Sequence, residues 1–148
     1  MAEPLRVPAN ADSLNFGSWA PPSGRNAQLQ PAGESWDAVR VPRFIGKQAL
    51  ELLGGDVGAV IENPFDGVLF WLIAPGAAAA WDMSRLPGVE VWGATAYIEV
   101  PPVGCRRGPG VRWRVPPRDR HLTDPAPLFA ALQTATREAL GPREEVPR

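Results

Sequence analysis

The residues best suited to chemistry in this sequence are arginines, and they are concentrated in one segment. Between positions 101 and 120 the chain has six arginines and one acid, so the segment carries a charge of +5 although the whole chain has a net charge of −1. Two of the arginines alternate with apolar residues, which places them on one face of a predicted β-strand. The segment therefore predicts a compact positive surface that can neutralise phosphate groups. The six residues are Arg106, Arg107, Arg112, Arg114, Arg118 and Arg120.

The same arginines are also compatible with two interpretations that need no partner. Lys47 is the only lysine among fifteen basic residues, and this bias, together with abundant Ala, Gly and Pro, is typical of a high-GC bacterial genome. Charged side chains on an edge strand also protect a sheet from aggregation.

Catalytic chemistry has little support in the sequence. The single cysteine, Cys105, and the single histidine, His121, are too few to complete a zinc site, and no serine lies in a GxSxG motif. The glycine motifs GxxxxGK[ST] and GxGxxG, which bind nucleotide phosphates, do not occur. We therefore expect neither an enzyme nor a cofactor.

Glu62 and Glu90 are the one pair of acids near the ends of predicted strands. Carboxylates that converge from two strands can hold a divalent cation. The alternative is that both acids are solvated or ion-paired at the ends of their strands.

The first elements that position these residues are a helix and a hairpin. A helix is predicted from Pro42 to Leu53, with Gly54 as its stop. Val57–Glu62 and Val68–Ala74 are apolar runs on either side of a turn sequence, NPFDG, and predict a hairpin. Its second strand is apolar on both faces, so we expect it in the centre of the sheet. The sequence AAAAWDM after it predicts a short helix.

A second hairpin is predicted from Val89–Gly93 and Thr95–Val100, which alternate about Gly93-Ala94. Its apolar face contains Val89, Val91, Ala96, Ile98 and Val100, and its other face presents Trp92 and Tyr97 with Glu90 and Glu99. If this aromatic face adjoins the arginines, bases can stack on it, as on other open sheets.

The last predicted elements are the strand Val111–Val115, with Val111, Trp113 and Val115 on one face, and a helix that begins after Asp124 and ends at Gly141. The element order predicts an α+β fold, with an antiparallel or mixed sheet of four or five strands and helices on one face.

The domain organisation follows from composition. Residues 1–35 are rich in Pro, Ala, Ser and Gly without periodicity, and predict a flexible tail in which Leu14–Trp19 is an apolar island that can dock on the domain or on a partner. Residues 36–141 form the predicted domain, and 142–148 a frayed end. No apolar run approaches the length of a membrane span, and the single cysteine is typical of a cytoplasmic protein.

The segments GAVIENPFDGVLFWLIAPG, LPGVEVWGATAYIEVPP and VRWRVPP resemble part of the N-terminal domain of bacterial bifunctional DNA primase/polymerases (prim-pol), over about residues 57 to 117. With WDAVRVP and LTD, they look even more like a group of small proteins of high-GC filamentous bacteria. The resemblance implies a prim-pol or RRM-like sheet and DNA affinity. Of the acids and histidine that bind metal and nucleotide in prim-pol, only Glu62 and Glu90 have matching positions, because Pro64 and Phe70 or Trp71 occupy the others.

Three functions are compatible with these patterns. The leading hypothesis is a non-catalytic interaction or regulatory protein that binds a partner through the arginine segment and the Trp92/Tyr97 face. A protein partner is preferred to a nucleic acid because the chain is slightly acidic. The alternatives are a reduced prim-pol-like, metal-dependent nucleotidyltransferase acting through Glu62 and Glu90, and a structural protein that assembles as a homo-oligomer through its sheet edges.

Overall fold

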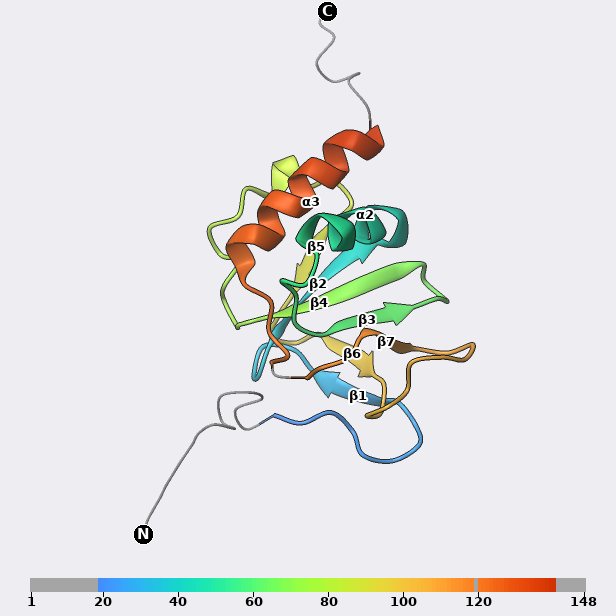
Figure 1. Cartoon of the computed structure of the whole chain (residues 1–148). Coiled ribbons are helices and arrows are strands. Elements are labelled where there is room, and N and C mark those ends of the chain that lie inside the picture. Colours follow the sequence, from blue (N-terminus) through green and yellow to red (C-terminus); the bar gives the residue numbers. More distant parts are fainter. Residues whose placement is uncertain (1–18, 119, 141–148) are drawn as a thin grey trace, which may run out of the picture.

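The structure, a computed structural model, describes residues 19–118 and 120–140, which form an α+β fold in three layers (Figure 1). A five-stranded sheet lies in the middle, two helices cover one of its faces, and a two-stranded sheet packs against the other. Every strand pair is antiparallel. The predicted α+β fold with helices on one face is therefore confirmed.

The central sheet has the strand order β5-β2-β4-β3-β7. All six residues of the middle strand β4 are buried, as the continuous apolar run predicted, and β3 and β4 form the predicted hairpin. The Oδ1 of Asn63 accepts hydrogen bonds from the amides of Phe65 and Asp66, which fixes the turn between them. The strands are β2 (Asp37–Pro42), β3 (Val60–Asn63), β4 (Val68–Ile73), β5 (Glu90–Trp92) and β7 (Arg112–Val115).

Helices α2 (Arg43–Leu53) and α3 (Pro125–Leu140) confirm the two amphipathic helices expected from the sequence. Their apolar faces pack on the side chains of β2, β3 and β4 that point to that side. Gly46 lets α2 approach the sheet closely, because a Cβ there would lie 2.7 Å from a methyl carbon of Leu69. Asp124 accepts a hydrogen bond from the Ala126 amide at the start of α3, as expected of an N-cap.

The opposite face of the sheet is covered by β1 (Gln28–Pro31) and β6 (Tyr97–Val100), which pair with each other. The predicted hairpin of residues 89–100 is therefore wrong: β5 pairs with β2 and β6 with β1, although each strand lies where we expected it. The turn at Gly93–Ala96, with Thr95 at a φ of 75°, carries the chain from one sheet to the other rather than back along the same sheet.

The predicted boundary at residue 36 is also wrong for the described part of the N-terminal segment. Residues 28–31 form β1, Ala32 is buried, and Trp19 packs edge-on against the fully buried Trp36. Trp19 thus docks on the domain, whereas the rest of the apolar island, residues 14–18, lies outside the described residues. The predicted frayed end at 142–148 lies outside them as well.

The alanine-rich segment after β4 forms turns rather than the short helix we predicted. Between β4 and β5, the described residues contain one helical turn, η2 (Met83–Arg85), which Asp82 caps through the Ser84 amide. Hydrogen bonds from the hydroxyl and then the amide of Ser84 hold the pKa of Asp82 below its ordinary value of 3.8.

Strand β7 is irregular at Arg114. The pairing with β3 shifts by one residue there, which is a β-bulge. Val111 and Trp113 lie in the core beneath the sheet, as predicted, but Val115 packs on the helix side instead of sharing their face.

Candidate functional site

Three guanidinium groups converge on the carboxylate of Glu62. Arg112 lies opposite Glu62 on the neighbouring strand β7, and its Nη2 is 3.4 Å from Glu62 Oε1. The Nη1 of Arg114 is 3.6 Å from the same oxygen, and the Nη1 of Arg43, the first residue of α2, is 3.4 Å from Oε2. We call these four residues the arginine cluster.

The acid of the cluster is buried and its arginines reach the surface. The Glu62 side chain is 3% exposed, whereas those of Arg112, Arg114 and Arg43 are 24%, 40% and 46% exposed. Among the residues that the structure describes, no other acid pairs with these arginines. The cluster is therefore a positive surface of net charge +2 that is anchored from beneath by one carboxylate.

Local structure explains how the cluster forms. Alternation along β7 directs Arg112 away from the face on which Trp113 lies. The bulge places Arg114 beside Arg112, on the helix side of the sheet. The Arg43 amide donates to the carbonyl of Gly67 at 2.8 Å, so the turn between β3 and β4 holds the beginning of α2 next to Glu62. A helix start, a hairpin and an edge strand thus meet at one corner of the sheet.

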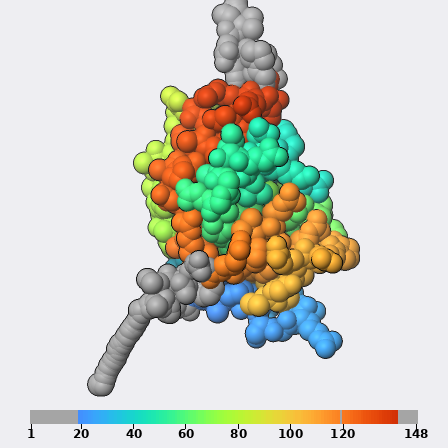
Figure 2. All heavy atoms as spheres, in the orientation of Figure 1, coloured from blue at the N-terminus to red at the C-terminus, as the bar shows by residue number. Residues whose placement is uncertain are grey.

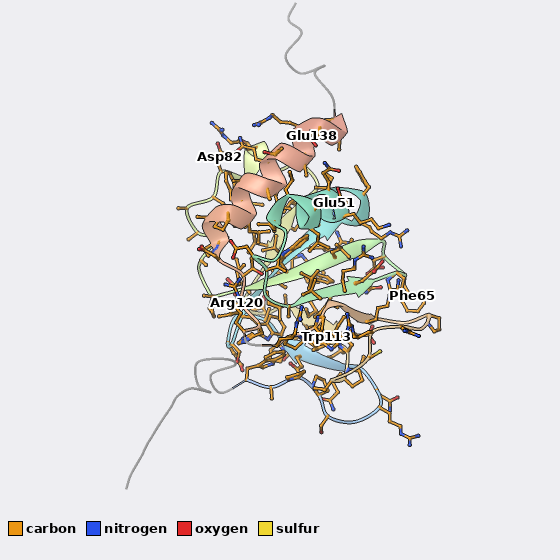
Figure 3. All side chains as sticks on the ribbon, in the orientation of Figure 1. Glu51, Phe65, Asp82, Trp113, Arg120 and Glu138 are labelled. Atoms are coloured by element: carbon orange, nitrogen blue, oxygen red, sulfur yellow. The ribbon has the colours of Figure 1, made fainter. Side chains whose placement is uncertain are left out.

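Two exposed phenylalanines lie on the elements that carry the cluster. Phe44 follows Arg43 in the first turn of α2 and is 64% exposed, and Phe65 lies in the turn between β3 and β4 and is 74% exposed. Figure 3 shows Phe65 at the edge of the molecule, on the side where β3 and β4 turn. We did not predict Arg43, Phe44 or Phe65 as site residues; the only signal was their position at a predicted helix start and a predicted turn.

The six predicted arginines do not form a single patch. Arg118 and Arg120 line a depression of about 410 Å³ together with Gly54 and Gly55, which follow the far end of α2, and Arg120 pairs with Asp56 at 3.0 Å. An eleven-residue helix is about 16 Å long, so these two arginines lie at the other end of α2 from Arg43. In Figure 3, Arg120 and Phe65 accordingly lie on opposite sides of the molecule.

Arg106 and Arg107 are exposed in the loop that precedes β7. This loop is held to the strand because the Trp113 amide donates to the Cys105 carbonyl and Arg112 Nη1 donates to the Gly108 carbonyl. Figure 2 shows the atoms of this segment, in orange, on the same face of the molecule as those of α2. The sequence therefore placed Arg112 and Arg114 together correctly, but the expectation of one compact patch of six is wrong.

Trp92 and Tyr97 do not share a surface with Arg112 and Arg114, contrary to our expectation. Trp92 lies on β5, the opposite edge strand from β7, and packs against Phe70 on the face away from the helices. Its indole donates to Glu90 and lies beneath the Arg40 guanidinium, so the ring is half-buried and engaged. Tyr97 is exposed, but it belongs to the other sheet.

Glu62 and Glu90 do not converge either, so of the two possibilities for these acids the shared metal site is excluded. They lie on β3 and β5, with β2 and β4 between them, and the register places Glu62 beside Leu69 on the helix side and Glu90 beside Arg40 on the other. Within residues 19–118 and 120–140, no three His, Cys, Asp or Glu side chains gather in a way that could hold a metal ion. Glu62 is instead an ion-paired acid, which was the alternative that the sequence left open.

Comparison with known proteins assigns the chain to no family. No protein-family model matches the sequence, and neither the curated proteins nor the solved structures give a match. Neither of the described helices is long and apolar enough to cross a membrane.

Proposed function

We propose that this is a non-catalytic interaction protein that binds an acidic segment of a partner protein through the arginine cluster. The observation that carries the proposal is the convergence of Arg43, Arg112 and Arg114 on one buried carboxylate. Burying Glu62 under the guanidiniums orders them, so a partner carboxylate meets donors that are already in place. We further expect the protein to act in the cytoplasm, as its cysteine content predicts.

The charge balance favours a protein partner. Nucleic-acid-binding domains are usually basic overall, whereas this chain has a net charge of −1 and a pI near 5.8. A local positive site on a slightly acidic protein attracts a short acidic segment without attracting long polyanions over the whole surface.

One observation favours a second candidate, single-stranded nucleic acid. Phe44 and Phe65 are exposed on the elements that carry the cluster, and bases stack on exposed aromatic rings beside cationic side chains. This arrangement replaces the Trp92/Tyr97 face as the aromatic part of that hypothesis.

Fluorescence anisotropy tests the proposal with two labelled probes, a decapeptide of alternating Glu and Gly and a ten-nucleotide oligothymidine. The acidic peptide is expected to bind, with an affinity that falls as salt rises, and Arg112→Gln or Arg114→Gln is expected to weaken binding about tenfold. Arg137→Gln, an exposed arginine on α3, is the matched control and leaves binding unchanged. Binding of the oligonucleotide alone selects the second candidate, and binding of neither probe at low salt contradicts both.

A further inference from the structure

We infer that the anionic group recognised by the arginine cluster is a phosphorylated serine or threonine in the partner segment. The inference rests on the proposed function, because it names the chemistry of the partner at the same site. Three features support it: the spacing of the guanidiniums, the unfilled donors at the start of α2, and the net charge of the cluster.

The first feature is spacing. Arg112 Nη2 and Arg114 Nη1 lie 3.4 and 3.6 Å from the same oxygen atom of Glu62, so they are no more than about 7 Å apart. Donors within this distance can contact different oxygens of one phosphoryl group by charge-assisted hydrogen bonds of about 2.8 Å. Each guanidinium has five N–H donors, and the Glu62 carboxylate has only two oxygens to receive them. The cluster therefore retains donors for a second anion.

The contacts with Glu62 are also longer than a fully formed charge-assisted bond. All three are 3.4 to 3.6 Å, against about 2.7–2.9 Å for such bonds, and Oε1 accepts no hydrogen bond within the part of the chain that the structure describes. Glu62 thus attracts the guanidiniums electrostatically but occupies few of their donors. Arg43 Nη1 makes one long hydrogen bond to Oε2, and Arg112 Nη1 donates to the Gly108 carbonyl. This nine-tenths-buried carboxylate makes the cluster a formed site rather than a chance gathering of surface arginines.

The second feature is the beginning of α2. Its N-cap is Pro42, which makes no side-chain hydrogen bond to the helix, and its first turn contains no acid. The Arg43 amide donates to Gly67, but Phe44 and Ile45 are the next residues, and amides at these positions have no acceptor within a helix. The helix therefore supplies no side-chain acceptor and no acid of its own for the positive end of its dipole, which lies at the residue that supplies one guanidinium of the cluster.

The third feature is charge. Three arginines and one glutamate leave a net charge of +2 concentrated around one carboxylate. A phosphorylated serine or threonine carries about −1.5 to −2 at pH 7 on three acceptor oxygens, whereas a glutamate carries −1 on two. A doubly charged, three-oxygen group matches the cluster in charge and in number of donors better than a single carboxylate does.

Isothermal titration calorimetry and anisotropy test the inference on the full chain, with three Gly/Ala nonapeptides that differ only in a central phosphoserine, glutamate or serine. At 0.15 M salt the phosphoserine peptide is expected to bind at least tenfold more tightly than the glutamate peptide, and the serine peptide not to bind. The affinity of the phosphoserine peptide is expected to rise between about pH 5 and 7, as the phosphate loses its second proton near pH 6. Inorganic phosphate is expected to compete with it.

The matched variants separate charge from geometry. Arg112→Lys keeps the charge but loses the planar fork of donors, so the preference for phosphoserine over glutamate is expected to fall several-fold; Arg137→Lys leaves it unchanged. Circular dichroism of each variant shows that the fold is kept, and Arg114→Lys provides an independent version of the same test if Arg112→Lys does not fold.

The outcomes distinguish the inference from the proposed function. If the phosphoserine and glutamate peptides bind equally, the inference is overturned and the proposed function stands. If none of the three nonapeptides binds but the Glu/Gly decapeptide does, only the inference is overturned; if the decapeptide does not bind either, both are overturned. If a 5′-phosphorylated oligothymidine binds more tightly than the phosphoserine peptide, the ligand is a nucleic-acid end and the inference is again overturned.

Discussion

Replacing Glu62 by glutamine tests whether the arginine cluster stabilises the fold as well as forming a site. The change keeps the size of the side chain and its ability to accept a hydrogen bond, but removes the negative charge that three guanidiniums surround at 3.4 to 3.6 Å. The three arginines would then repel one another around a neutral group.

The expected loss in the free energy of unfolding follows from how exposed the three arginines around Glu62 are. Two unit charges 4 Å apart attract by about 4 kcal/mol at an effective dielectric constant near 20, before the loss of hydration is subtracted. Arg43 and Arg114 are 46% and 40% exposed, so water screens their pairs and each contributes little. Arg112, at 24%, contributes most, and we expect a net loss of about 2 kcal/mol in the free energy of unfolding.

Urea denaturation followed by tryptophan fluorescence measures this loss, which corresponds to a fall in the melting temperature of roughly 6 °C for a chain of this size. Glu51→Gln on the exposed face of α2 is the control, with an expected change within about 0.5 kcal/mol. If Glu62→Gln is as stable as the original protein or more so, the hydration lost by burying the carboxylate outweighs its ion pairs, and a stabilising role for the cluster is refuted.

Three further substitutions and one control test the packing and turns of the fold, each by urea denaturation. Gly58→Ala places a Cβ 2.7 Å from backbone atoms of the 121–122 segment and is expected to destabilise the fold by about 2 kcal/mol, whereas Gly110→Ala, with open space around it, is expected to have little effect. Asp37→Ala removes a 2.8 Å hydrogen bond to a loop amide and is expected to lose about 1–2 kcal/mol. Gly67→Ala, at a φ of 68°, is expected to lose about 1 kcal/mol through backbone strain alone; no loss at this position would mean that the turn adopts another conformation.

The elements that could be predicted from the sequence are those determined by nearby residues. Both helices, the central strand β4 and the β3–β4 turn follow from periodicity and from capping or turn residues within a few positions. Strands β5 and β6 were also located correctly, because alternation is a property of a single strand.

The pairing of strands could not be predicted in the same way. An alternating pattern on both sides of Gly93 is identical for a hairpin and for two strands in different sheets, and only the distant partners β1 and β2 distinguish them. Strand β1 itself, with the sequence QLQP, carries almost no apolar signal.

The candidate site was likewise predictable only where it depends on residues close together in the sequence. The alternating sequence of β7 predicted Arg112 and Arg114 on one face, and both contact Glu62, although the bulge at Arg114 breaks the alternation at Val115. Arg43 lies about seventy positions earlier and joins them only because α2 packs at the corner where β3 turns, which no local pattern indicates.

The pairing of β1 with β6 has a consequence for how the chain acquires its fold. Gln28 pairs with Val100, so the two-stranded sheet closes a loop of about seventy residues, and β2 finds β5 only after about fifty. The entropy lost in closing such loops is compensated only when the non-local strand pairs have formed, late in folding, and this is typical of slowly folding domains. While the chain is being synthesised, the underside of the central sheet, with Ile61, Phe70 and Leu72, therefore stays uncovered until β6 emerges. We expect the time for which this apolar surface is uncovered, rather than the stability of the folded protein, to determine the highest temperature at which the protein can be produced without aggregating.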